Sequence, residues 1–219
     1  MQTGEVVTIV RDEQELVART MHLFASASDV ACAANDLFTW AGARMTDEHS
    51  AMYRRRRPDD VRIRKVYRSG TLLDPVAAQA LARARDQHGA QIRITSGEIN
   101  ETIVLDQRLV ILAGDLSAGR RSFSIITQPE AVQGVISLFE AAWRSATDLS
   151  VYDTQIAEIR HLAPQVLDLL GQGIKDEAAA RTLGLGVRTY RRRVAELMDA
   201  LGAESRFQAG VRARELGLV

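Results

Sequence analysis

The sequence has few of the residues that support disulfides, metal clusters or membrane spans. Cys32 is its one cysteine, which excludes both an intrachain disulfide and a cysteine metal cluster. No apolar run reaches the roughly 18 residues of a transmembrane candidate. Acids interrupt the first roughly thirty residues, where a secretory signal needs an apolar core. We therefore expect a cytoplasmic protein.

Histidine, lysine and net charge are also scarce. The four histidines, His22, His49, His88 and His161, show no metal-ligand spacing, so we expect neither a metal nor a cofactor. Lysine occurs only at Lys65 and Lys175, and arginine carries almost all of the basic charge. Because nucleotide bias in a genome produces the same preference, arginine content alone is not a functional signal.

The zero net charge conceals an uneven distribution. From residue 159 to residue 219, ten basic residues stand against seven acidic ones, which gives this segment a charge of +3. The rest of the chain then carries −3, since the total is zero. The neutral total thus conceals a mildly basic C-terminal module, in which the positive charge is concentrated on one segment.

The chain of 219 residues, 46% of them hydrophobic, is long enough for two domains. We predict an N-terminal domain over residues 1–147, a linker over 148–158 and a C-terminal domain over 159–219. The linker prediction rests on the segment "SATDLSVYD", which follows a long apolar helix pattern.

Residues 187–202 have the periodicity of an amphipathic helix. One apolar stripe is formed by Tyr190, Val194, Leu197, Met198 and Leu201. At about 100° per residue, the opposite side holds Arg188, Arg192, Ala195 and Asp199, with Arg191 and Arg193 on the two flanks. The pattern predicts a helix with a cationic outer surface, which Gly202 ends.

Three further short helices are expected around this one. "IKDEAAARTLG" predicts a helix closed by Gly184, and "PQVLDLLGQG" predicts one that opens at Pro164. "SRFQAGVRARELGLV" predicts the last helix. Two short helices joined by "LGLG", the second with a basic outer face, are typical of a helix-turn-helix, whose second helix enters the major groove.

Residues 165–218 resemble the C-terminal DNA-binding domain of LuxR-type (GerE-like) regulators. An apolar "VLxLLxQG" helix, "AxxLG", a threonine followed by an apolar and a basic residue, and "LGAxSRxQA" occur together at the family's spacing. The sequence departs from the family at some positions. Ala163, Pro164 and Gln165 replace acids, and Gly186 replaces a serine cap at a cost of a few tenths of a kcal/mol. Val187 replaces an acid, and Arg193 replaces histidine.

The resemblance implies a set of contacts. Thr189 would contact a phosphate, while Arg191, Arg192 and Ala195 would lie nearest the base edges, with Arg188 and Arg193 flanking the groove. Lys175 completes the DNA-binding set that we predict. The implied dimer surface is the final helix around Phe207, Val211 and Leu216. A homodimer would read two half-sites about one DNA turn apart.

The first 147 residues alternate between strand-like and helix-like segments. Strands are predicted at "EVVTIV", "DVACAA", "VRIRKVYR", "QIRIT", "ETIVLD", "RLVILAG" and "SFSIIT". Helices are predicted at "DEQELVARTMHLFASAS", "DPVAAQALARARDQHG" and "QPEAVQGVISLFEAAWRSAT". This order favours an α/β domain with a mixed sheet in front of an all-α, four-helix C-terminal domain.

The pattern "VRIRKVYRSGTLLDP...HGAQIRIT...ETIVLDQRLVILAG" resembles the phospholipase-D-like sensor domain of TrmB-like regulators, over residues 5–146. Phospholipase-D catalysis needs HxKxxxxD, in which histidine is the nucleophile and lysine stabilises phosphate charge. With the aspartate placed at Asp106, the histidine position holds Ile99 and the lysine position holds Glu101. A carboxylate there would repel a phosphodiester, so we expect no catalytic residues and a noncatalytic sensor or dimerisation domain.

The sequence therefore predicts a DNA-binding transcriptional regulator that an effector or protein partner controls through the N-terminal domain. Phe38, Trp40, Tyr53 and Tyr67 could line an effector pocket, although core packing explains them equally well. Two alternatives stay open: a phospholipase-D-like phosphodiesterase or nuclease, and a protein-interaction module that presents its arginines to acidic partners.

Overall fold

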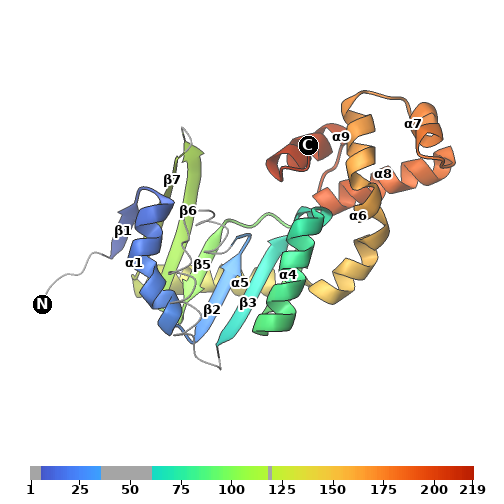
Figure 1. Ribbon diagram of the computed structural model, residues 1–219. Helices are drawn as coiled ribbons and strands as arrows, with labels where there is room; N and C mark the ends of the chain where they lie inside the picture. Colours follow the sequence, from blue (N-terminus) through green and yellow to red (C-terminus); the bar gives the residue numbers. More distant parts are fainter. Residues whose placement is uncertain (1–5, 36–60, 118–119) are drawn as a thin grey trace, which may run out of the picture. The chain divides into compact units, whose positions relative to one another are not determined.

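The computed structural model describes residues 6–35, 61–117 and 120–219, and it is α/β with a mixed sheet (Figure 1). The chain divides into two compact units. The first unit comprises residues 1–67, 89–93 and 99–145, and the second comprises residues 68–88, 94–98 and 146–219. The two units are described separately below.

From β1 to β4, the sheet has the strand order β1-β7-β6-β5-β2-β3-β4. Its strands are β1 (Val7–Val10), β2 (Asp29–Ala33), β3 (Arg62–Arg68), β4 (Gln91–Thr95), β5 (Thr102–Leu105), β6 (Leu109–Ser117) and β7 (Arg120–Ile126). Strands β2 and β3 are parallel, whereas β1–β7, β7–β6, β6–β5 and β5–β2 are antiparallel pairs. The predicted mixed sheet is confirmed, because the sheet contains both parallel and antiparallel pairs. Each of these strands overlaps a predicted segment.

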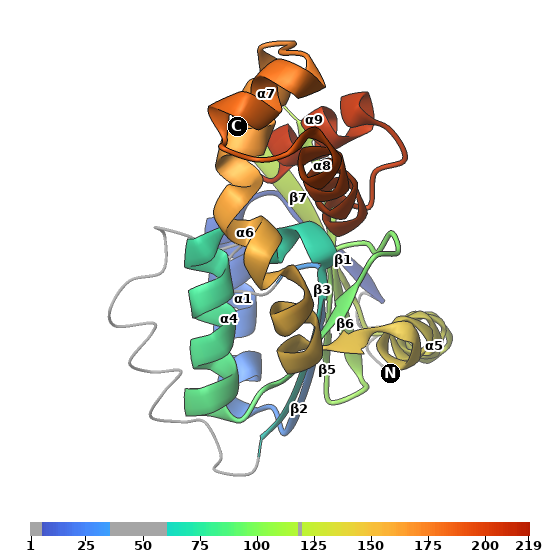
Figure 2. The same ribbon diagram turned by 90° about the vertical axis from the view of Figure 1, so that its right-hand side faces the viewer.

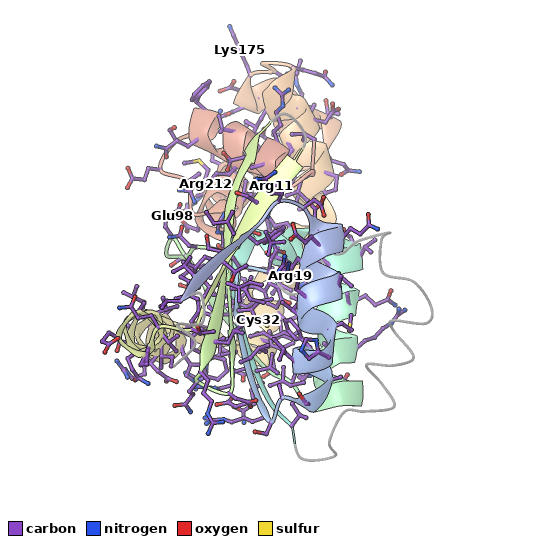
Figure 3. All side chains as sticks on the ribbon, turned by 90° about the vertical axis from the view of Figure 1, so that its left-hand side faces the viewer. Arg11, Arg19, Cys32, Glu98, Lys175 and Arg212 are labelled. Carbon is purple, nitrogen blue, oxygen red and sulfur yellow. The ribbon has the colours of Figure 1, made fainter. Side chains whose placement is uncertain are left out.

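Two helices cover opposite faces of this sheet (Figure 2): α1 (Glu13–Ser26) and α5 (Pro129–Ser145). Asp12 caps α1 by accepting a hydrogen bond from the Glu15 backbone N–H at 2.8 Å. Helix α1 buries Leu16 and Phe24, while α5 buries Val132 and Phe139. Cys32 is buried inside the sheet and forms no disulfide (Figure 3).

The second unit is mainly helical. Its elements are η2 (Ser69–Leu73, a 3-10 helix), α4 (Pro75–His88), β8 (Thr147–Asp148), α6 (Leu149–Gly171), α7 (Asp176–Thr182), α8 (Val187–Leu201) and α9 (Arg206–Glu215). Helix α8 packs against α6, α7 and α9, and η2 contacts α4, α6 and α8. The sequence predicted neither η2 nor β8.

Helix α6 differs from its prediction. The helix begins at Leu149, where Asp148 caps it by accepting from the Ser150 backbone N–H at 2.9 Å, and Pro164 lies inside it. The prediction that Pro164 opens the helix is therefore wrong, and the helix ends at Gly171, within the range of Gly171 to Gly173 that its sequence favours. Proline removes one backbone donor and crowds the carbonyl four residues earlier, and α6 bends partway along (Figure 1).

The predicted linker at residues 148–158 is also helical, because α6 includes all of it after Asp148. Helix α4, which we assigned to the N-terminal domain, belongs to the same compact unit as α6 to α9. The domain boundaries at 147 and 159 stay a prediction. Among the described residues, no helix is both long and apolar enough to span a membrane.

Candidate nucleic-acid interface

Helix α8 has the bounds and ends that its sequence predicts. It starts after Gly186, which as a glycine provides no side-chain cap. It ends at Gly202, whose φ of 64° lies in the left-handed region that glycine adopts without strain. The Ala203 backbone N–H donates to the Met198 carbonyl at 2.8 Å and closes the helix end.

The apolar stripe faces the interior of the second unit. Tyr190, Val194, Leu197 and Leu201 are buried, as predicted, while Met198 is half-buried. Ala200 is also buried, although the predicted stripe did not include it. Burial of this stripe fixes which side of α8 faces outward.

Arg188, Arg192 and Ala195 lie on the exposed side, where the periodicity placed them. The Arg192 side chain is 63% exposed, and its Nε lies 3.7 Å from a Glu196 carboxylate oxygen. An exposed ion pair at this distance contributes less than about 1 kcal/mol, so it does not prevent Arg192 from binding elsewhere. These positions have the access that a groove contact needs.

Arg191 lies on one flank of α8, against the start of α7. Its Nε donates to Asp176 Oδ2 at 2.8 Å, and its Nη2 lies 3.4 Å from a Glu177 carboxylate oxygen. The Arg191 side chain is still 59% exposed. Protein acids therefore hold this guanidinium without covering it.

Arg193 lies on the other flank. Its surroundings differ from those of the exposed, groove-flanking residue that we expected. Its side chain is only 13% exposed and is paired with Glu158 of α6 and, at 2.7 Å, with Glu196. Hydrogen bonds from Arg193 to Glu196 and Glu158 raise its pKa. In this structure Arg193 joins α8 to α6, which is a structural role.

The two remaining predicted DNA contacts lie near the N-termini of the two helices. Thr189 is half-exposed in the first turn of α8. Lys175 is exposed, directly precedes α7 and projects away from the unit (Figure 3).

The predicted dimer residues fall into two groups. Phe207 and Val211 are exposed one helical turn apart on α9, with Phe207 81% exposed. Leu216 instead packs against Gly70 within the same unit. The two are so close that a methyl group added at Gly70 would lie 2.4 Å from Cδ1 of Leu216. Leu216 is half-buried there, and its predicted dimer contact stays a prediction.

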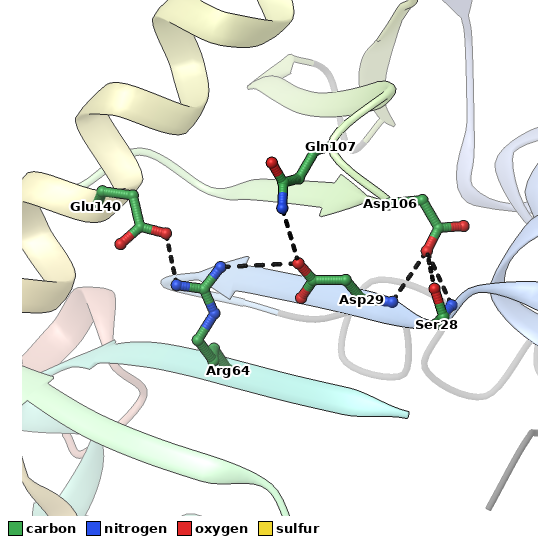
Figure 4. Close-up of polar contacts among 6 residues, drawn as sticks. All are labelled: Ser28, Asp29, Arg64, Asp106, Gln107 and Glu140. Carbon is green, nitrogen blue, oxygen red and sulfur yellow. Dashed lines mark hydrogen bonds and ion pairs between the residues drawn. The ribbon is translucent and has the colours of Figure 1, made fainter. Parts of the chain in front are cut away.

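The phospholipase-D positions are engaged in structural contacts. Glu101 accepts two hydrogen bonds from Arg121, at 2.5 and 3.1 Å. Asp106 lies in the β5–β6 turn and accepts from the backbone N–H groups of Ser28 and Asp29 at 2.8 and 2.9 Å (Figure 4). Although burial raises the pKa of Asp106, these bonds lower it on balance.

Of the four aromatic residues that could line an effector pocket, the structure describes only Tyr67, which is buried in the core. Phe38, Trp40 and Tyr53 lie outside the described residues. Within the described ranges no group of three His, Cys, Asp or Glu side chains could hold a metal ion.

Sequence reasoning missed two acids that organise this interface, Asp176 and Glu158. Asp176 contacts Arg191 across 15 residues of sequence, and Glu158 contacts Arg193 across 35. Helical periodicity relates residues three or four apart, so it carried no signal for either contact.

Comparison with known proteins identifies one curated relative. Over 132 residues the chain is 33% identical to the Bialaphos biosynthetic pathway regulatory protein of Streptomyces hygroscopicus, covering 60% of this chain and 52% of the relative. The chain thus spans about half the length of this relative. No family model matches the chain.

Solved structures resemble part of the fold. TrmBL2, an archaeal chromatin protein whose structure shows a novel mode of DNA binding, matches 67% of this chain and 55% of its own at 17% identity and a TM-score of 0.47. Nuc of Salmonella typhimurium, a phospholipase D family member, matches 65% of this chain and 96% of its own, at 12% identity and a TM-score of 0.47. NucT of Helicobacter pylori matches 65% of this chain and 98% of its own, at 9% identity and a TM-score of 0.49.

Proposed function

We propose that this chain is a DNA-binding transcriptional regulator that reads the major groove with α8. The observation that carries the proposal is the division of α8 into a buried apolar stripe and an exposed side with Arg188 and Arg192. The LuxR-type resemblance over residues 165–218 and the regulatory relative support it. A cytoplasmic location follows from this role.

The exposed arginines would serve two purposes in binding. Each guanidinium can neutralise a phosphate, and this sequence-independent part of the affinity falls steeply as salt rises. The planar fork of Arg192 can also donate two hydrogen bonds to guanine O6 and N7, which is worth about 1–3 kcal/mol of discrimination. Thr189 would contact a phosphate and so position the helix without reading sequence.

We further propose that the chain acts as a homodimer. A single short helix-turn-helix reads few base pairs, and a dimer doubles the site. Exposed Phe207 and Val211 on α9 support this surface, and Leu216 lies half-buried at the end of the same helix. The N-terminal unit would be a phospholipase-D-like sensor through which an effector or partner changes the arrangement of the recognition helices. Such an effector must bind the two arrangements with different affinity.

We propose that this chain is not a phosphodiesterase or nuclease and catalyses no reaction. The residues at the phospholipase-D positions are Ile99 and Glu101, neither of which can act as nucleophile or stabilise phosphate charge, and Glu101 is paired with Arg121. Incubation with a generic phosphodiester should give no turnover. Hydrolysis that the Glu101→Gln variant abolishes would contradict this part of the proposal.

Selection of bound duplexes from a random DNA pool with the full chain tests the proposed function. We expect an enriched motif with two-fold symmetry. Enrichment of a motif without symmetry would reject the dimer, and no enrichment would reject the DNA-binding function.

Two variants separate base reading from phosphate contact. Arg192→Ala should relax base preference at one position of each half-site by about 1–3 kcal/mol. Thr189→Val should weaken all sequences alike, because a phosphate carries no sequence information. An unchanged motif with Arg192→Ala would show that another residue reads that base pair.

A further inference from the structure

The Asp176 carboxylate connects three helices of the second unit. Asp176 is the first residue of α7; its Oδ2 accepts from Nε of Arg191 in α8 at 2.8 Å, and its Oδ1 is paired with Nη1 of Arg206 in α9 at 2.8 Å. The Asp176 side chain is 14% exposed, whereas both arginines remain accessible. A largely buried acid thus holds two outward-facing cations.

The electrostatics keep this carboxylate ionised. Hydrogen bonds from Arg206 and Arg191 lower the pKa of Asp176, and the same contact with Asp176 raises the pKa of Arg206. The position also suits an acid, because the first turn of a helix favours negative charge. Asp176 therefore stays ionised at neutral pH, accepting a hydrogen bond from Arg191 and forming an ion pair with Arg206.

The geometry determines which donors Arg191 keeps. Its Nε is directed to Asp176, and Nη2 has only a long contact of 3.4 Å to Glu177, a carboxylate that is 61% exposed. The guanidinium therefore retains Nη donors for a partner outside the protein. A guanidinium held by one edge loses less rotational freedom when its other edge binds.

We propose that Asp176 is a positioning residue for base recognition: it fixes the Arg191 guanidinium so that the Nη edge, rather than the whole mobile side chain, meets one base pair. This inference rests on the proposed DNA-binding function and adds to it. Asp176 itself touches no DNA, and because it is an acid, it weakens rather than strengthens attraction to phosphates.

The two roles of Asp176 can be separated because it has two partners. Arg206→Gln removes the pair with α9 and leaves the contact with Arg191. Comparing Arg206→Gln with the double variant Asp176→Asn/Arg206→Gln therefore removes only the Arg191 contact. Glu177→Gln is the matched control for loss of one acid beside the same guanidinium.

The experiment is DNA selection from a random pool with the full chain and these variants, followed by binding to the selected duplex and its single-base substitutions. Arg191→Ala identifies the base pair that Arg191 reads. We expect Asp176→Asn to lower discrimination at that same pair by about three- to tenfold, with equal or higher affinity for unrelated DNA. Arg206→Gln and Glu177→Gln should leave discrimination there unchanged.

Several results would overturn the inference. If the wild-type motif is enriched and Asp176→Asn retains full discrimination at the Arg191 pair, the positioning role fails while the proposed function stands. The same holds if Arg191→Ala changes no position. If the wild type enriches nothing, both fail. Should Asp176→Asn not fold, as circular dichroism would reveal, Asp176→Glu retains the charge, displaces the carboxylate and should still reduce discrimination.

Discussion

The two units of this protein use arginine in opposite ways. In the sheet unit, Arg64 is buried, donates to Glu140 at 2.5 Å (Figure 4) and lies 5.2 Å from the centre of the Phe139 ring. In the helical unit, Arg188 and Arg192 extend from α8 into solvent. One residue type therefore joins a helix to a sheet in the first unit and provides an exposed cationic face in the second.

A cluster of arginines in the sequence is therefore not one functional surface. The three consecutive arginines of α8 have different environments. Arg191 is paired but accessible, and Arg192 is exposed. Arg193 is largely buried and paired with Glu158 and Glu196. Arg193 resembles Arg64 more than it resembles its neighbour. Burial and partners, rather than position in the cluster, separate binding from structural arginines.

Arg64→Ala should have the largest effect. It leaves Glu140 without its partner at 2.5 Å and removes the cation beside Phe139. Loss of one partner from a buried pair costs about 3–5 kcal/mol, and we expect the lower end because Glu140 is partly exposed. Urea unfolding of the full chain measures it. A change below about 0.5 kcal/mol, typical of a surface substitution, would remove the contrast between the units.

Arg193→Ala tests the arginine whose position and role differ. We expect a loss of about 1–2 kcal/mol in unfolding free energy, because charged hydrogen bonds to Glu158 and Glu196 disappear. The DNA motif should stay the same. Unchanged stability together with a relaxed base preference would restore the groove-flanking role that the family pattern implies.

Acidification tests the contacts of Asp176 with Arg191 and Arg206, here called the Asp176 cluster. Because Arg206 and Arg191 lower the pKa of Asp176 from its ordinary 3.8, the stabilisation is fully present above that value. It is lost as pH falls through the lower pKa of the folded state. The unfolding free energies of wild type and Asp176→Asn should therefore differ by about 1–2 kcal/mol at neutral pH. This difference should shrink when the same measurement is made at acidic pH. A constant difference would contradict the cluster.

Phe207→Ser should have the smallest effect on stability, within about 0.5 kcal/mol, because the ring is 81% exposed. Its effect should instead be on assembly. Analytical ultracentrifugation should show a dimer for the wild type and a monomer for the variant, with Gln208→Ser as a control on the same helix. A monomeric wild type would leave Phe207 without this role.

Local patterns allowed much of the fold to be predicted. Strand segments such as "VRIRKVYR" and the stripe from Tyr190 to Leu201 carry their own periodicity, and Gly202 carries the signal for a helix end. The start of α6 was not predictable in the same way. Pro164 normally opens a helix, yet contacts of α6 with η2 and α8 support a helix that continues through it.

The candidate site was predictable only in part for the same reason. Periodicity identified which arginines face outward, because that depends on neighbours three or four residues away. It could not identify Glu158 as the partner of Arg193, or Gly70 as the neighbour of Leu216, since these residues are far apart in sequence. Their pairing is set by tertiary packing.

The salt dependence of binding shows whether the exposed side of α8 binds DNA through its arginines, as we claim. The affinity of the full chain for one selected duplex should fall steeply with salt, and Arg188→Ala should reduce the slope of log affinity against log salt by about one. Affinity that does not respond to salt, or an identical slope for wild type and Arg188→Ala, would contradict the claim.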